Sequence, residues 1–393
     1  MTVDAAGVAS LNLTVSNIKG AVSLDGAADG ALKTLNLTVS GADSSFALTA
    51  AAVETLSIAG DRTATLSTGT LTALKAVTVS GTAGAVFDGD EADTLTSVNT
   101  SATTGKVTAT IDGTKATYTG GAGVDTVTLA AGTALTKAVN LGAGDDTVIF
   151  GVAVTGSTAA LNGGDGTDTL SMSVANADVL DATTQTFYTN FERLVLNSAA
   201  GDNDDTADTV TIDLEKLGFT NYVTTNGTVL DTAPAKSDTL ILANLASGGT
   251  VVIAAAAAGA NTKQTVQIKD AATGTADILN VSLNTAASLN VGTLTAANTE
   301  TVNLTSVDTE TGATPTANTY TLVLTANNAS TVNLTGSNNF ALTLTGSTKV
   351  TSIDGSALTG TLDVTSLNTT SATTIKGGAA NDVLTAATGT TAD

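Results

Sequence analysis

The sequence predicts an all-β protein: a parallel β-roll or β-helix solenoid with about 20–22 residues per coil. Three observations predict this fold. Strand-like segments repeat every 21 residues, three glycine-aspartate turns follow at the same spacing, and small or β-branched residues dominate the composition. Such residues suit narrow coils whose interior holds one thin layer of side chains.

The N-terminal repeat supports a β-solenoid over residues 1–115. Leu35, Leu56, Val77 and Val98 are each 21 residues apart, and each lies in a short segment that alternates apolar and polar residues. Alternation of this kind is typical of a strand with one buried face. A constant period predicts one strand per coil, always on the same face of the solenoid.

Three copies of a glycine-aspartate turn define the next segment, predicted as a calcium-binding β-roll over residues 116–174. Their sequences are GGAGVDTVT from Gly120, LGAGDDTVI from Leu141 and GGDGTDTLS from Gly163. The glycines allow positive φ and close backbone approach, and the aspartates supply the hard anionic oxygens that calcium prefers. The candidate metal-site residues are Gly120, Gly121, Gly123, Asp125, Gly142, Gly144, Asp145, Asp146, Gly163, Gly164, Asp165, Gly166 and Asp168.

The spacing of these aspartates indicates stacked sites. Asp125 and Asp146 are 21 residues apart, and Asp146 and Asp168 are 22 apart, so the turns are expected to lie above one another on one edge. Three stacked turns predict at least two Ca²⁺ ions between them. The simpler reading, a glycine-rich turn with a local aspartate cap, accounts for one copy better than for three.

Weaker candidates for metal binding lie outside this array. Asp93 belongs to a degraded turn, residues 88–96, in which Glu91 replaces a glycine. Asp208 ends the acidic run that begins at Asp202, and a solvated acidic loop explains that run equally well. Further candidates precede strand-like segments: Asp238, Asp277 and Asp382.

Residues 175–237 are predicted as an irregular connecting region with a bend, for which the polar stretch around Pro234 is a reasonable place. Phe187, Tyr188 and Phe191 are most simply a plug on the narrow core, with carbohydrate stacking as the alternative.

Residues 238–393 are predicted as a C-terminal solenoid that ends in a partial glycine-aspartate turn. Asp238 and Asp277 begin similar segments 39 residues apart, which we interpret as about two coils. Asparagines at equivalent strand positions predict turn caps or a stacked amide ladder: Asn12, Asn36, Asn303 and Asn333.

Composition excludes several function classes. A net charge of −22, with 14 basic residues, gives no cationic footprint for nucleic acid. There is no cysteine for disulfides, and no apolar run is long enough to cross a bilayer. The absence of histidine and cysteine excludes nucleophile-histidine catalysis.

These segments together resemble the type I-secreted RTX surface-layer proteins of Gram-negative bacteria, of the Caulobacter type, and specifically their C-terminal assembly region. The likeness is strongest over residues 71–197, including Phe191–Leu196, and returns at Ala272–Val281 and Ile375–Gly378. The resemblance implies a secreted protein that folds with calcium outside the cell. It also implies self-assembly into a two-dimensional lattice at the bacterial surface.

In that family an N-terminal domain anchors to lipopolysaccharide and a C-terminal signal directs export. We recognise neither in this chain, so we expect anchoring through a region outside it and expect the chain to be part of a longer protein. The rival readings are a calcium-stiffened adhesin and a polysaccharide-active β-helix enzyme. For the enzyme, Arg193 near Tyr188 is the one cluster to test. An ice-binding face is a further reading of the threonine-rich strands, which β propensity explains more simply.

Overall fold

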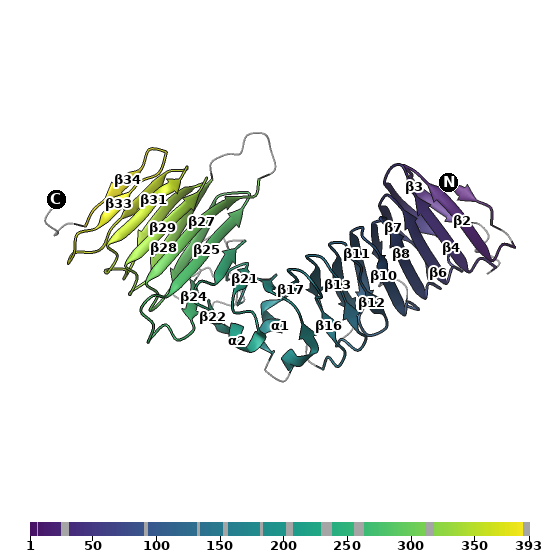
Figure 1. The fold of residues 1–393 in the computed structure, drawn as a ribbon, viewed down its shortest axis with the longest axis horizontal. Coiled ribbons are helices and arrows are strands. Elements are labelled where there is room, and N and C mark those ends of the chain that lie inside the picture. The colour runs from purple at the N-terminus through teal and green to yellow at the C-terminus, as the bar shows by residue number, and fades with distance from the viewer. Residues whose placement is uncertain are drawn as a thin grey trace. The chain divides into compact units, whose positions relative to one another are not determined.

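The computed structural model is nearly all β, with parallel strands stacked as a solenoid of about 15 turns (Figure 1), as the sequence predicts. It describes residues 1–5, 7–24, 31–89, 93–131, 134–151, 156–180, 184–201, 207–228, 238–254, 263–310 and 318–387. Three predicted features lie outside these residues, namely Glu91, the acidic residues Asp202–Asp205 and Pro234.

The chain divides into two compact units. The first contains residues 1–172 and 179–192, and the second contains residues 173–178 and 193–393. Short helices occur near the point where the chain passes between the units; within the described residues they are α1 (Val174–Asp178), the 3₁₀ helix η2 (Thr184–Phe187) and α2 (Leu214–Leu217).

Two parallel sheets form the first unit, and the chain alternates between them. One sheet contains β1 (Thr2–Val3), β3 (Lys19–Leu24), β5 (Ser44–Thr49), β7 (Ala64–Thr70), β9 (Ala85–Asp88), β11 (Val107–Asp112), β13 (Thr126–Ala131), β15 (Thr147–Phe150) and β17 (Thr169–Met172). The other contains β2 (Ser10–Val15), β4 (Thr34–Val39), β6 (Thr55–Gly60), β8 (Ala76–Gly81), β10 (Ser97–Thr103), β12 (Thr117–Thr119), β14 (Val139–Asn140), β16 (Leu161–Asn162) and β18 (Tyr188–Thr189).

In the second unit the chain again alternates between two sets of parallel strands. The odd-numbered set contains β19 (Arg193–Leu196), β21 (Tyr222–Thr225), β23 (Thr250–Ile253), β25 (Ile278–Thr285), β27 (Thr301–Asp308), β29 (Thr331–Gly336), β31 (Ser352–Leu358) and β33 (Thr374–Lys376). The other contains β20 (Thr209–Asp213), β22 (Thr239–Leu245), β24 (Lys263–Ile268), β26 (Leu289–Thr295), β28 (Thr319–Thr325), β30 (Asn339–Leu344), β32 (Leu362–Thr365) and β34 (Val383–Thr385).

The strand register of the first unit confirms the 21-residue period. Leu35 pairs with Leu56, Leu56 with Val77, and Val77 with Val98. The same column continues into the glycine-aspartate segment through Tyr118, Val139 and Leu161, and Leu161 pairs in turn with Tyr188. The N-terminal coils and the turn-bearing coils are therefore one stack.

Alternation along each strand builds the core. In β4 the side chains of Leu35, Leu37 and Val39 are buried, and the residues between them are partly exposed. The fully buried rings include Tyr118, Tyr320, Phe46 and Phe150.

The predicted aromatic plug is confirmed. Phe187, Tyr188 and Phe191 are each less than a tenth exposed. The Phe187 ring centroid lies 6.0 Å from that of Phe150 and 5.2 Å from that of Tyr188. These rings pack in the interior of the first unit, where they are not available to stack against a sugar.

Coil length varies more in the second unit, and one prediction there is wrong. Thr301 pairs with Thr331, 30 residues on, whereas Thr331 pairs with Ser352, 21 residues on. The strands that follow Asp238 and Asp277 lie in different sheets, so the 39-residue spacing does not correspond to two coils. A spacing measured between similar segments cannot reveal that intervening loops differ in length.

The predicted amide ladder is present in both units. Asn36 donates to Asn12 over 2.7 Å in the first unit. In the second, Asn333 donates to Asn303 over 2.8 Å, and Asn303 donates to Asn280 over 2.8 Å. Because the strands are in register, the side-chain amide of one asparagine can donate a hydrogen bond to the amide oxygen of the asparagine one coil away.

Candidate metal centre

The three glycine-aspartate turns lie on successive coils. They precede β13, β15 and β17, and Thr126 pairs with Thr147, which pairs with Thr169. Asp125, Asp146 and Asp168, one residue earlier in each case, therefore recur at one position of the coil. The side chains of all three are buried.

Glycine is required in these turns because their backbones stack closely. Gly144 has φ 131° and Gly166 has φ 141°. A Cβ added to Gly144 would lie 2.6 Å from the Gly123 carbonyl oxygen, and one added to Gly166 would lie 1.9 Å from the Gly144 carbonyl oxygen. Gly142 and Gly164 have the same constraint, so carbonyl oxygens line the stacked turns.

The remaining glycines of the motif also lie against neighbouring groups. A Cβ on Gly120 would overlap the Leu141 carbonyl, and one on Gly121 would lie 2.3 Å from the Thr103 carbonyl oxygen. A Cβ on Gly163 would lie 2.7 Å from Asp168 Oδ2, so this glycine makes room for the carboxylate itself.

Each buried aspartate connects two coils through one oxygen. Asp146 Oδ1 accepts a hydrogen bond from the Asp125 backbone N–H over 2.6 Å, and Asp168 Oδ1 accepts from the Asp146 N–H over 2.8 Å. Glu192 Oε2 continues the ladder by accepting from the Asp168 N–H over 2.7 Å. The carboxylates thus hold the turns in register.

The second oxygen of two aspartates has no partner. Asp146 Oδ2 and Asp168 Oδ2 are buried and make no hydrogen bond. An unpaired anionic oxygen removed from water is costly, because lost hydration is not replaced. These atoms mark the place where a cation would complete the turn.

Electrostatics agree with this geometry. Burial, reinforced by the charges of Asp125 and Asp168, raises the pKa of Asp146 to about 7. Burial also raises the pKa of Asp168, with Glu192 the largest contributor among the neighbouring charges. Without a counter-ion, the folded turns therefore favour protonated carboxyls.

Asp125 differs from the other two. Its Oδ1 accepts from the Val107 N–H over 2.9 Å, and its Oδ2 accepts from the Tyr118 hydroxyl over 2.9 Å. Burial raises the pKa of Asp125 as well. Burial and the Asp125 charge raise the pKa of Tyr118, so its hydroxyl stays protonated.

The exposed acids of the motif stabilise the turn backbone. Asp145 Oδ1 accepts from the Thr167 N–H over 2.9 Å. Asp165 is paired with Ala143 through its backbone, and its N–H donates to the Gly142 carbonyl over 2.9 Å. Both side chains are exposed and add negative charge around the buried carboxylates.

These donors fit a hard cation. No group of three acidic side chains that could hold a metal comes together within the described residues, so a cation here would take its other ligands from carbonyl oxygens or water. Calcium accepts six to eight such oxygens in flexible geometry, which suits two carboxylates and a lining of glycine carbonyls. Residues Asp146 and Asp168 would supply the charged ligands.

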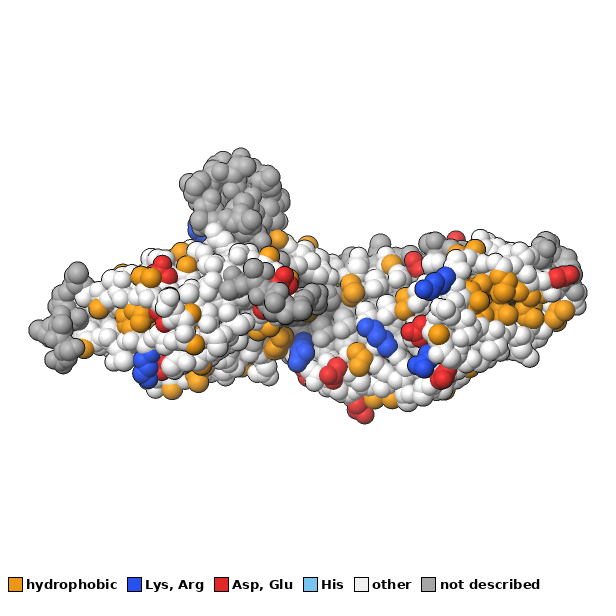
Figure 2. Space-filling view, turned by 90° about the horizontal axis from the view of Figure 1, so that it is seen from above, with side chains coloured by type: hydrophobic (Ala, Val, Ile, Leu, Met, Phe, Trp, Pro, Cys, Tyr) orange, Lys and Arg blue, Asp and Glu red, His pale blue; other side chains and the backbone are white. Residues whose placement is uncertain are grey.

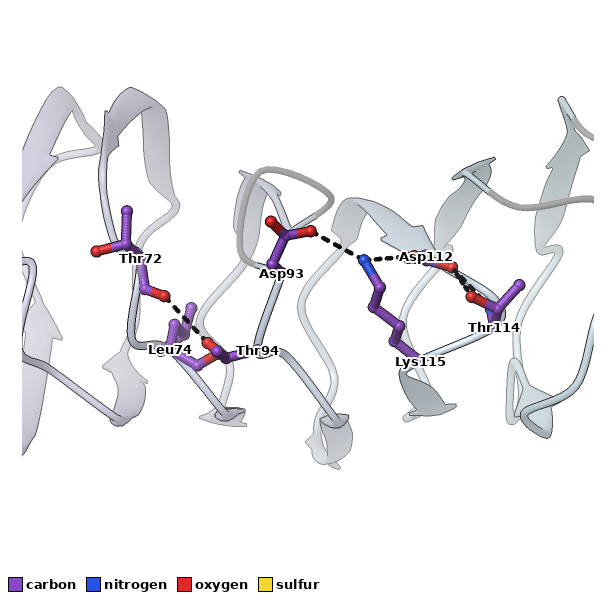
Figure 3. Close-up of polar contacts among 7 residues, drawn as sticks. All are labelled: Thr72, Leu74, Asp93, Thr94, Asp112, Thr114 and Lys115. Atoms are coloured by element: carbon purple, nitrogen blue, oxygen red, sulfur yellow. Dashed lines mark hydrogen bonds and ion pairs between the residues drawn. The ribbon is translucent and has the colours of Figure 1, made fainter.

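Asp93 lies in a different environment (Figure 3). Its side chain is 91% exposed and pairs with Lys115, whose Nζ lies 2.9 Å from Asp93 Oδ1. The same Nζ lies 3.0 Å from Asp112 Oδ2, and Thr114 donates to Asp112 (Figure 3). Asp93 is thus an exposed carboxylate in an ion pair with a lysine, unlike the buried aspartates of the three turns.

The second unit contains related carboxylate ladders. Asp238 is buried, its Oδ1 accepts from the Asp208 N–H over 2.9 Å, and the Asp208 side chain is exposed. Asp277 Oδ2 is buried without a hydrogen-bond partner, and the Asp277 N–H donates to Glu300 Oε2 over 2.8 Å. Asp277 thus shares with Asp146 a buried second oxygen without a hydrogen-bond partner.

In Asp382 both oxygens are engaged: Oδ1 accepts from the Leu362 N–H and Oδ2 from the Gly378 N–H, each over 2.8 Å. This residue is therefore a turn cap in its present geometry.

Sequence reasoning missed Glu192 and Glu300. Each stands one coil after a buried aspartate, 24 residues beyond Asp168 and 23 beyond Asp277, and each directly precedes a strand. An acid at that position, one coil on, is the signal that could have identified them. The motif did not predict these residues because it contains aspartate and no glutamate.

Arg193, singled out for the enzyme alternative, has its guanidinium carbon 4.8 Å from the centroid of the Tyr222 ring. Stacking of this kind is a common structural use of arginine.

On the face drawn in Figure 2, basic and acidic side chains are scattered, and no continuous basic patch is visible among the coloured residues.

No family model matches the chain, and no curated protein matches it in sequence. Among the described residues, no helix has the length and apolar character needed to cross a membrane.

Proposed function

We propose that this chain is a calcium-binding structural protein that folds outside the cell and self-assembles into a bacterial surface-layer lattice. The observation that carries the calcium assignment is the pair of buried, unpartnered oxygens, Asp146 Oδ2 and Asp168 Oδ2, on consecutive stacked turns. A bound cation would supply the partner that each of these two anionic oxygens lacks.

Within this proposal the two carboxylate oxygens have separate roles. Oδ1 of Asp146 and Asp168 holds the neighbouring coil by its backbone N–H, and Oδ2 is kept for the ion. Bound calcium would supply the positive charge that this cluster of acids lacks. It would also reduce the net charge of −22.

Calcium then acts as a folding signal. Extracellular modules bind calcium at about 10⁻⁴–10⁻³ M, far above cytosolic levels. A ligand that binds only the folded state stabilises it by about 2.7 kcal/mol per site at 100 times its Kd. Glycine-rich turns have a large entropy cost of ordering, so they are the segments that this stabilisation would affect most.

The lattice and the cell-surface location rest on the resemblance of the flanking threonine- and alanine-rich coils to surface-layer proteins. The parallel solenoid is compatible with that role, because long regular faces can repeat contacts between copies. The proposed partner is a second copy of the chain.

Circular dichroism during a calcium titration tests the folding part. We expect β signal to rise with calcium from a largely disordered state in chelator, with magnesium less effective because it dehydrates reluctantly. A spectrum that is fully β in chelator and unchanged by calcium would contradict the proposal.

Electron microscopy of the purified chain tests the assembly part. Regular two-dimensional arrays that appear on adding calcium would support it. Dispersed particles at all protein concentrations, with binding to glycans, would instead favour the adhesin.

A further inference from the structure

The first of the three turns is built differently from the other two. Both oxygens of Asp125 accept hydrogen bonds, from the Val107 N–H and from the Tyr118 hydroxyl. In Asp146 and Asp168, Oδ2 has no partner. Three similar turns therefore do not offer three equivalent oxygens to a cation.

The strand register explains this difference. Tyr118 pairs with Val139, and Val139 pairs with Leu161, so the three residues occupy one interior column. Of these three residues, only Tyr118 has a hydroxyl to donate; the next residue of the column, Tyr188, lies beyond the third turn. Tyr118 is 1% exposed, and its hydroxyl also accepts from Thr100 over 3.3 Å, so the ring and its oxygen are held in place.

The turn backbones differ in the same way. Gly142 and Gly164 have φ 102° and 110°, and Gly144 has φ 131°, close to that of its counterpart in the third turn. Gly121 and Gly123, their counterparts in the first turn, do not adopt positive φ. The second and third turns thus share one conformation and the first has another.

We propose that Tyr118 terminates the cation array by occupying the Asp125 oxygen that a cation would otherwise require. This inference rests on the proposed calcium binding and deepens it. The carboxylates of Asp146 and Asp168 would hold ions, while Asp125 would serve as the hydrogen-bonded end of the array. The coil before Tyr118 then joins the first turn through the hydrogen bond from the Val107 N–H to Asp125 Oδ1, which does not depend on calcium.

Isothermal titration of the full chain with calcium, after removal of metal with chelator, provides the test. Asp125→Asn should leave the number of bound ions unchanged, since Asn keeps an acceptor for the Val107 N–H and an amide that the Tyr118 hydroxyl can accept from. Asp146→Asn should lower the number by one. Equal losses in the two variants would overturn the inference.

Tyr118→Phe is the complementary variant, because it keeps the ring and removes only the hydroxyl. It leaves Asp125 Oδ2 unpartnered, so we expect one more bound calcium than in the wild type. Combining it with Asp125→Asn should abolish the gain. An unchanged number in folded Tyr118→Phe would overturn the inference; if this variant does not fold, Asp125→Asn decides alone.

Calcium titration of the wild type distinguishes a failure of the proposed function from a failure of the role proposed for Tyr118. If it binds no calcium, the proposed function fails. If it binds calcium but Asp125→Asn reduces the number of ions as Asp146→Asn does, the proposed function stands and the role of Tyr118 is wrong.

Discussion

At the scale of the residue, one carboxylate oxygen in each of two turns decides what the turns can do. Oδ1 of Asp146 is satisfied by the backbone of the neighbouring coil, and Oδ2 is buried without a partner. Leaving a buried anionic oxygen unpaired costs a few kcal/mol at most sites. Such an arrangement is stable only when a proton or a cation supplies the missing charge.

Asp146→Asn tests this directly. The amide oxygen keeps the hydrogen bond from Asp125, but the charged ligand is lost. We expect the calcium concentration at the folding midpoint to rise at least about tenfold, because ligand charge sets calcium affinity. Circular dichroism during titration measures it.

Asp145→Asn is the matched control, since Asp145 is exposed and its oxygen bonds the Thr167 N–H. Its midpoint should change little. Equal shifts for the two variants would show that general charge, and not the buried oxygen, governs binding.

The raised pKa of Asp146, about 7 against a usual 3.8, predicts how pH acts without calcium. The folded state holds this proton more tightly than the unfolded state does. The stabilisation is therefore complete below pH 3.8 and is lost as the pH rises towards 7.

In chelator we expect more β signal and a higher Tm at pH 5.5 than at pH 8, measured by circular dichroism. Asp146→Asn should reduce this difference. A Tm in chelator that is equal at the two pH values, or higher at pH 8, would contradict the assignment of a buried, uncompensated carboxyl.

At the scale of the element, the turn depends on backbone contact as much as on its acids. Gly144 has φ 131°, and a Cβ added there would lie 2.6 Å from the Gly123 carbonyl oxygen. Gly20 has φ 94°, and no atom lies within 4 Å of the position that a Cβ would take. The two glycines thus separate strain in φ from exclusion by a neighbouring coil.

Gly20→Ala should cost about 1–2 kcal/mol, the usual strain of a left-handed residue. Gly144→Ala should cost more than this and should raise the calcium midpoint, because the Gly123 carbonyl must move away. Chemical denaturation at saturating calcium compares the free energies of unfolding of the two variants, and circular dichroism during a calcium titration gives their midpoints. Similar losses for both, with unchanged calcium midpoints, would show that the stacked carbonyls are not part of the site.

At the scale of the whole molecule, a solenoid transmits stability mainly between neighbouring coils. The carboxylate array lies in the first unit, while β28 and β30 lie in the second. Loss of an ion should therefore weaken the structure near the turns first.

Hydrogen exchange of Asp146→Asn and wild type at saturating calcium would show this. We expect exchange at least about tenfold faster in β13, β15 and β17, and less than about twofold faster in β28 and β30. A uniform increase along the chain would instead indicate that the protein unfolds as one cooperative unit.

Sequence by itself determined the parallel solenoid, the 21-residue register and the stacking of the three turns. These follow from a repeat, because each coil must place its apolar residues over those of the last. The pairing of Leu35, Leu56, Val77 and Val98 is the direct consequence. Where coil length varies, as between Asp238 and Asp277, spacing alone wrongly predicted that the two following strands are two coils apart, whereas they lie in different sheets.

Only the tertiary structure decided which oxygens are free. Asp125, Asp146 and Asp168 look alike in the motif, yet Tyr118 satisfies one of them from the interior, and Glu192 continues the ladder one coil later. A motif records the residues of one turn. The partners of a buried carboxylate come from adjacent coils, and their presence depends on packing across the whole stack.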